Sequence, residues 1–168
     1  VERSLRVLDG AVAVICAVDG VQPQTETVWK QADEFSVPRL CFMNKMDRIG
    51  ADFFGSMDDV AEKFGVQTLA LQIPIGQEDL FKGVVDLIRN KALIWDEASN
   101  GTKFYEVPMP DDLKDIVDEY RQKLIEGVAE DNEALMEKYF EGEEFTREEM
   151  ISGLKAGVLS GDICPVYA

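Results

Sequence analysis

The feature that most constrains the fold is a pair of short apolar runs joined by a helical pattern. Residues 11–18 (AVAVICAV) and 39–43 (RLCFM) are predicted to be strands, because each is short, apolar and bounded by turn-forming residues. Between them, apolar residues recur at helical spacing over residues 21–35, with Pro23 near the first helical position. This order predicts a parallel βαβ unit in an α/β, doubly wound domain. We expect residues 11–18 to be a central strand, buried on both faces.

A polar loop, residues 44–49 (NKMDRI), follows the second strand at its carboxyl end, the edge of such sheets where ligands bind. It contains Asn44-Lys45-Met46-Asp47, a match to the pattern N-K-x-D. The Asp47 carboxylate can accept from both N1–H and N2–H of guanine, whereas adenine presents an acceptor at N1. The Lys45 stem can lie along the base, and the Asn44 amide can donate to the purine edge. The alternative is an ordinary polar turn, but the preceding βαβ unit favours a guanine site.

From residue 67 onward the pattern changes to short strands and then helices. Short strand-like runs at 68–75, 83–88, 91–95 and 103–107 predict a small antiparallel or mixed sheet. Helices are predicted at 110–128, at 135–140, and from a capping box at Thr146 and Glu149 to about residue 159. We therefore divide the chain into a nucleotide-binding part (1–66), an inserted α+β subdomain (67–161) and a returning strand (162–168).

Composition excludes several classes of function. The 168 residues carry a net charge of -16, which opposes binding to a bare phosphate backbone. The sequence has no His, so no His-containing catalytic triad is possible within it. Cys16, Cys41 and Cys164 lie far apart in apolar surroundings and are predicted to be buried thiols in a reducing compartment, with no disulfide and no metal site. No apolar run is long enough to cross a membrane, and we expect a cytoplasmic protein.

Most of the negative charge lies in one stretch. Residues 106–149 hold 16 acidic and 5 basic residues, a net charge of -11. Such a stretch is either a solvated helical surface or a docking surface for a basic protein partner.

Several longer segments closely resemble translational GTPases. The likeness to their consecutive strand, helix and guanine-loop segments is carried by residues 1–18, 19–32 and 38–54. Some members carry an insertion called G-prime, which resembles three further stretches of this sequence: residues 74–88 (PIGQEDLFKGVVDLI), 95–97 and 135–142 (LMEKYFEG). The resemblance implies a partial P-loop-NTPase-type GTP-binding domain with an inserted α+β subdomain. One departure is residues 151–161, rich in Gly and Ser where the family usually has Ala and Leu.

The resemblance also implies a function for the longer family protein. It implies GTP hydrolysis that drives translocation of tRNA and mRNA on the ribosome, with GTP or GDP and Mg²⁺ bound. Asn44, Lys45, Met46 and Asp47 are the nucleotide contacts that carry over. In the family, the phosphate-binding loop, the first switch and the catalytic His lie upstream of the position matching Val1. We therefore expect the 168 residues to hold no catalytic residue and no Mg²⁺ ligand, and not to hydrolyse GTP by themselves.

The resemblance further implies partners. The ribosomal stalk protein would contact the acidic helices, and ribosomal RNA would contact other parts of the family protein. Two alternatives remain: another translational GTPase, such as a ribosome-protection or release-type factor, and a non-enzymatic acidic interaction module.

Overall fold

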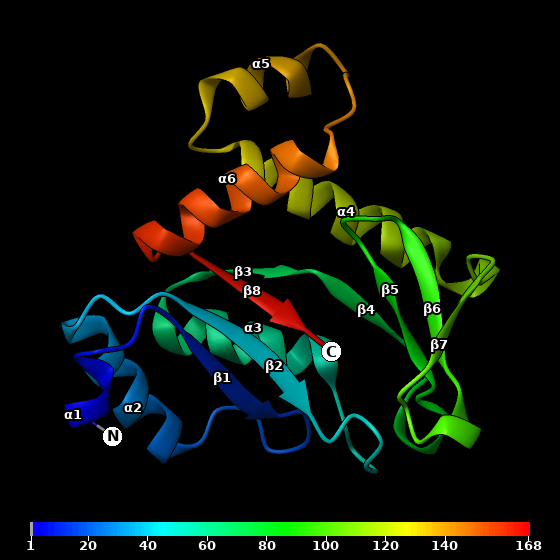
Figure 1. Cartoon of the computed structure of the whole chain (residues 1–168), viewed down its shortest axis with the longest axis horizontal. Helices are drawn as coiled ribbons and strands as arrows, with labels where there is room; N and C mark the ends of the chain where they lie inside the picture. Colours follow the sequence, from blue (N-terminus) through cyan, green and yellow to red (C-terminus); the bar gives the residue numbers. More distant parts are fainter. Residues whose placement is uncertain (1) are drawn as a thin grey trace.

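Two four-stranded sheets organise the chain (Figure 1). The structure is a computed structural model that describes residues 2–168. The first sheet is parallel and has the strand order β1-β2-β8-β3. Its strands are β1 (Ala11–Cys16), β2 (Arg39–Asn44), β8 (Ile163–Tyr167) and β3 (Gln67–Ala70). The predicted βαβ unit is confirmed, and the last strand of the chain returns to this sheet as predicted.

Helices cover the two faces of the parallel sheet. One face carries α2 (Pro23–Glu34) and α3 (Phe53–Phe64), and the short α1 (Glu2–Leu5) contacts α2. The other face carries α4 (Lys114–Ala129) and α6 (Arg147–Ser160), with α5 (Glu133–Phe140) packed on α4 (Figure 1). This arrangement is the predicted doubly wound α/β architecture.

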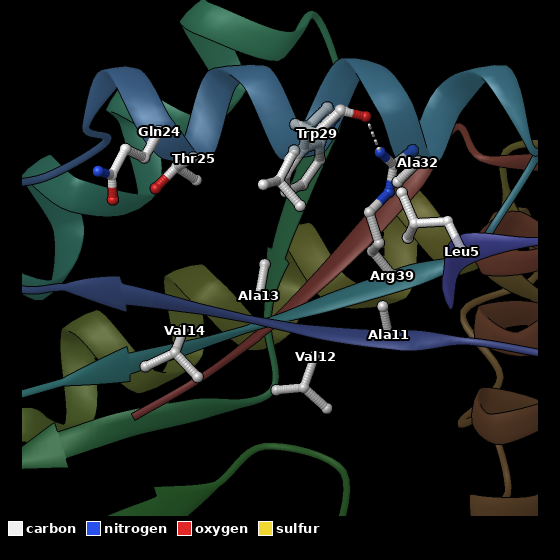
Figure 2. Close-up of a pocket in the computed structure, with 11 residues that line it drawn as sticks. Leu5, Ala11, Val12, Ala13, Val14, Gln24, Thr25, Trp29, Ala32 and Arg39 are labelled. Atoms are coloured by element: carbon white, nitrogen blue, oxygen red, sulfur yellow. Dashed lines mark hydrogen bonds between the residues drawn. The ribbon is translucent and has the colours of Figure 1, made fainter. Parts of the chain in front are cut away.

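The predicted position of the first strand is wrong. Within the described residues, β1 lies at the edge of the sheet and pairs with β2 alone. Ala11 and Ala13 point toward α2, whereas Val12 and Val14 point to the opposite side and are 59% and 57% exposed (Figure 2). The run is apolar on both faces, but an apolar pattern does not report how many strands pair with it.

The second sheet is antiparallel, with its strands in sequence order. It comprises β4 (Gln72–Ile75), β5 (Gly83–Asp86), β6 (Lys91–Trp95) and β7 (Phe104–Val107). Three short 3-10 helices flank these strands, η1 (Glu78–Leu80), η2 (Glu97–Ser99) and η3 (Asp111–Leu113). In the chain, this sheet and the helices α4, α5 and α6 lie between β3 and β8 of the parallel sheet, and we call this segment the insertion.

The predicted boundary of the insertion at residue 67 needs correction. Residues 67–70 form β3 of the parallel sheet, and β4 starts only at residue 72. Leu71 joins the two sheets, because its N–H donates to Val166 (2.9 Å) and its carbonyl accepts from Leu87 (3.0 Å). Buried side chains of both sheets then form one continuous core. The insertion is therefore packed directly on the parallel sheet.

Helix ends follow the local signals. The Asp52 side chain accepts from the Gly55 N–H at the start of α3, and Gly65 ends that helix with φ +64°. Thr146 and Glu149 form the predicted capping box of α6. No helix of the described residues is long and apolar enough to span a membrane.

The three cysteines are free thiols, and the predicted burial is confirmed for Cys41 and Cys164 but not for Cys16. Cys41 and Cys164 are buried on neighbouring strands with their Sγ atoms 3.4 Å apart, whereas Cys16 is half-buried. The hydrogen bond shared with Cys164, together with burial, raises the pKa of the Cys41 thiol.

Candidate functional site

The polar loop after β2 is a compact turn at the carboxyl edge of the parallel sheet. Lys45 adopts a left-handed conformation with φ +65°. The Arg48 N–H then donates to the Lys45 carbonyl (3.1 Å), and the Ala51 N–H donates to the Arg48 carbonyl (3.0 Å). These bonds close the loop on itself before α3 begins.

The four predicted contact residues separate into two groups by burial. Met46 is only 4% exposed and packs in the core. Asn44, Lys45 and Asp47 are exposed. The loop is thus anchored by one apolar side chain, while the three polar side chains remain available to a ligand.

The end of β1 holds both ends of this loop. The Ala17 N–H donates to the Asn44 carbonyl (2.9 Å), and the Ala17 carbonyl accepts from the Asp52 N–H (2.8 Å). The Ser56 hydroxyl, which is buried, donates to the same carbonyl at 3.2 Å. Neighbouring strands of a parallel sheet end at the same edge, which explains why the β1 loop lies beside the β2 loop.

The insertion contacts the loop directly. A carboxylate oxygen of Glu78 accepts from the Gly50 N–H at 2.8 Å. The Gln77 side-chain amide donates to the Ala51 carbonyl at 2.9 Å. Sequence reasoning missed both residues, because 28 and 26 residues separate the bonded partners and no local pattern signals the contact.

A hollow of about 560 Å³ opens beside the loop. Asn44, Lys45 and Asp47 line it, together with Phe81 and Trp95 of the insertion. The volume falls in the range of small-molecule sites, and apolar walls with a few polar groups are typical of them. Trp95 is half-buried and is one of the residues that line the hollow.

A second hollow, of about 290 Å³, lies between α2 and β1 (Figure 2). Its polar contact is structural: the Arg39 guanidinium lies over the Trp29 ring at 4.4 Å and donates to the Trp29 carbonyl at 2.9 Å. The rest of the lining is mainly apolar, so this hollow offers less selective chemistry than the loop after β2.

Among residues 2–168, no three Cys, Asp or Glu side chains gather in a group that could hold a metal ion. We assign no Mg²⁺ ligand to this chain.

Comparisons with known proteins show which proteins the chain is similar to. The family model described as Elongation factor Tu GTP binding domain matches residues 1–161. The chain is 58% identical to Elongation factor G of Amoebophilus asiaticus (strain 5a2) over 167 residues, which cover 99% of this chain and 24% of that protein. A crystal structure of a Thermus thermophilus protein matches with a TM-score of 0.85 at 28% identity, over 98% of this chain and 24% of that one.

The chain therefore spans about a quarter of the length of the proteins that it matches. Because the family model covers nearly all of the sequence, the chain belongs to the family of elongation factor Tu GTP-binding domains.

Proposed function

We propose that this chain is the guanine-recognising part of an elongation factor that hydrolyses GTP and drives translocation of tRNA and mRNA on the ribosome. Membership of a GTP-binding domain family and the identity with an Elongation factor G support the proposal. The same identity favours this assignment over a ribosome-protection or release-type factor.

The observation that carries the proposal is the loop after β2. It presents Asn44, Lys45 and Asp47 at the ligand-binding edge of a parallel sheet, and Met46 is buried beneath them. The hollow beside these side chains is large enough for a nucleobase.

Each polar side chain has a distinct role toward the base. The Asp47 carboxylate accepts from N1–H and N2–H of guanine in a bidentate pair. The Lys45 stem lies along the base plane, and the Asn44 amide donates to the purine edge. Adenine presents an acceptor where guanine presents N1–H, so an adenine base would leave Asp47 facing a lone pair. That mismatch costs about 1–3 kcal/mol or more, which is enough to select guanine.

These residues bind and orient the base, and they do not hold the phosphates. GTP hydrolysis needs a phosphate-binding loop, Mg²⁺ and a group that orients water, none of which we assign to this chain. We therefore expect the chain alone to bind guanine compounds weakly and not to hydrolyse GTP.

The acidic helices form a second proposed surface. Asp115, Asp118 and Glu119 are exposed on α4, within the stretch that carries most of the negative charge. Charge complementarity favours a lysine-bearing partner. We propose that this partner is the ribosomal stalk protein, that ribosomal RNA contacts other parts of the longer protein, and that the protein acts in the cytoplasm.

The test is a titration of the isotope-labelled chain with guanosine and, separately, with adenosine, followed by amide chemical shifts in NMR spectra. Guanosine should shift the amides of residues 44–47, and adenosine at the same concentration should leave them in place. Equal shifts with both nucleosides, or shifts with neither, would contradict the guanine assignment. Either result is expected if the chain is a non-enzymatic interaction module in which the N-K-x-D loop is incidental.

A further inference from the structure

We propose that the insertion positions the guanine loop, through the side chains of Glu78 and Gln77. The inference rests on the proposed guanine site and adds two positioning residues that lie outside the N-K-x-D motif. Both residues belong to the turn between β4 and β5, residues 76–82, which we call the β4–β5 turn.

The two contacts fall on the segment that follows Asp47. Glu78 accepts from the Gly50 N–H at 2.8 Å, and Gln77 donates to the Ala51 carbonyl at 2.9 Å. Because a carboxylate accepts the first of these bonds, it is a charge-assisted hydrogen bond and stronger than a bond between neutral groups. Glu78 itself is half-buried.

The β4–β5 turn is itself tightly fixed. Gly76 has φ +83°, and a Cβ at this position would overlap the carbonyl oxygen of Leu80. The Phe81 N–H donates to the Glu78 carbonyl, and the Lys82 N–H donates to the Ile75 carbonyl, each at 3.0 Å. A rigid turn can restrain a neighbouring loop, whereas a mobile one cannot.

The backbone of Glu78 adds a second indication. Its φ of +54° lies in the left-handed region, which glycine adopts freely and other residues adopt at a cost. Glycine would fit this backbone conformation without cost, yet the sequence has a glutamate at this position. The contact with Gly50 is what that side chain provides.

The same part of the insertion also lines the hollow. Phe81 follows η1 directly, and Trp95 lies on β6; both line the hollow. The two are linked through Lys82, the residue after Phe81, because the Trp95 N–H donates to the Lys82 carbonyl at 3.0 Å. The β4–β5 turn thus restrains the guanine loop, and Phe81 and Trp95 line the hollow beside it. Loss of the Glu78 contact should free residues 48–51 and reduce the fraction of loops that hold Asp47 in the binding position.

The test uses the full chain with Glu78→Gly, which removes the acceptor and suits the positive φ, so that the change does not strain the backbone. We expect guanosine binding to weaken by about 3- to 10-fold, because the binding-competent fraction falls. The thermal unfolding midpoint should stay the same or rise. Gln77→Ala should weaken guanosine binding in the same direction.

Two controls separate positioning from charge. Glu78→Gln keeps an oxygen that can accept from Gly50, so it should restore most of the affinity that Glu78→Gly loses. Asp79→Ala removes the neighbouring exposed carboxylate and should leave guanosine binding unchanged.

A second measurement makes the inference independent of nucleotide. Amide relaxation and hydrogen exchange of residues 44–51 should show greater mobility in Glu78→Gly than in the wild type without any ligand. An unchanged loop in Glu78→Gly would overturn the positioning role. Failure of the wild-type chain to bind guanosine, with the loop nonetheless loosened in Glu78→Gly, would overturn the proposed function and leave the positioning contact established.

Discussion

The aromatic rings of Trp29 and Phe64 are stacked, with their centroids 4.1 Å apart and an angle of 2° between their planes. The pair joins α2 to α3 on one face of the parallel sheet. Arg39 covers the Trp29 ring at 4.4 Å, while the indole Nε1, which is buried, has no hydrogen-bond partner within the described residues. The stacking therefore contributes more to stability than the polar edge of the indole does.

Two substitutions test whether the ring stacking stabilises the fold more than the polar edge of the Trp29 indole does. Phe64→Ala should lower the free energy of unfolding by about 3 kcal/mol, because it removes a large ring from the stack. Trp29→Phe should cost about half as much, since it keeps an aromatic ring on Phe64 and removes an N–H that has no partner. Chemical denaturation of both variants measures the difference, and an equal loss in both would contradict it.

Glycines in α6 allow close packing of that helix. A Cβ at Gly153 would lie 2.8 Å from the carbonyl oxygen of Val128 in α4, and a Cβ at Gly157 would overlap Ile163 of β8. Gly153→Ala should therefore lower the free energy of unfolding by about 1–3 kcal/mol, even though alanine favours helix.

Ser152→Ala is the matched control, because Ser152 is exposed in the same helix. It should leave stability unchanged or raise it slightly. A gain of stability in Gly153→Ala would show that the tight contact does not constrain the helix.

The capping box makes the stability of α6 depend on pH. Hydrogen bonds from the Thr146 backbone and from Lys138 lower the pKa of the Glu149 carboxyl below its ordinary 4.5. A group whose pKa is lower in the folded state stabilises the fold above its unfolded pKa, and that stabilisation is lost as the pH falls through the folded pKa. Glu149→Gln should therefore lose less stability than the wild type on acidification below about pH 4.5.

Denaturation curves from neutral pH to strong acid check this result, with Glu148→Gln as the control because Glu148 is exposed and adjacent. At neutral pH, Thr146→Ala should cost about 1 kcal/mol through loss of the cap. Parallel pH profiles for wild type and Glu149→Gln would exclude a role of this carboxylate.

The acidic face of α4 is tested by charge reversal. Replacing Asp115, Asp118 and Glu119 with Lys should slow association with the isolated ribosomal stalk protein at low salt, because steering by opposite charge is lost. Stopped-flow kinetics at increasing salt concentration measure the effect, which should shrink as salt screens the charges.

Asp9, Glu34 and Glu62 offer a matched triple reversal, since they are exposed, lie outside α4 and change the net charge equally. That control should slow association much less. Equal slowing by the two triple variants would assign the effect to net charge and not to this face.

Local features of the fold could be predicted from the sequence, whereas contacts between distant segments could not. The Thr146–Glu149 capping box depends on residues within one turn of each other, and it is confirmed. The Asp52 cap and the Gly65 terminus depend on equally local signals. The edge position of β1 and the division of residues 67–75 between two sheets depend on strand pairing, which an apolar pattern does not specify.

The candidate site shows the same division. Asn44, Lys45, Met46 and Asp47 could be found because they are contiguous and follow a strand. The contact between Glu78 and Gly50 could not, since it depends on how the insertion packs on the parallel sheet. The burial of Met46 also required the structure, because the N-K-x-D pattern allows any residue at that position.

The most direct test of the central claim is a change of base preference in Asp47→Asn. An amide can accept from N1–H and donate to the additional carbonyl of xanthine, whereas it cannot accept both guanine donors. Titration of the chain with guanosine and xanthosine should show guanosine affinity falling by about 10- to 100-fold and xanthosine affinity rising. Asp19→Asn, an exposed change in the loop after β1, should leave both affinities as in the wild type. Guanosine affinity that survives Asp47→Asn intact would contradict the assignment of this loop to guanine.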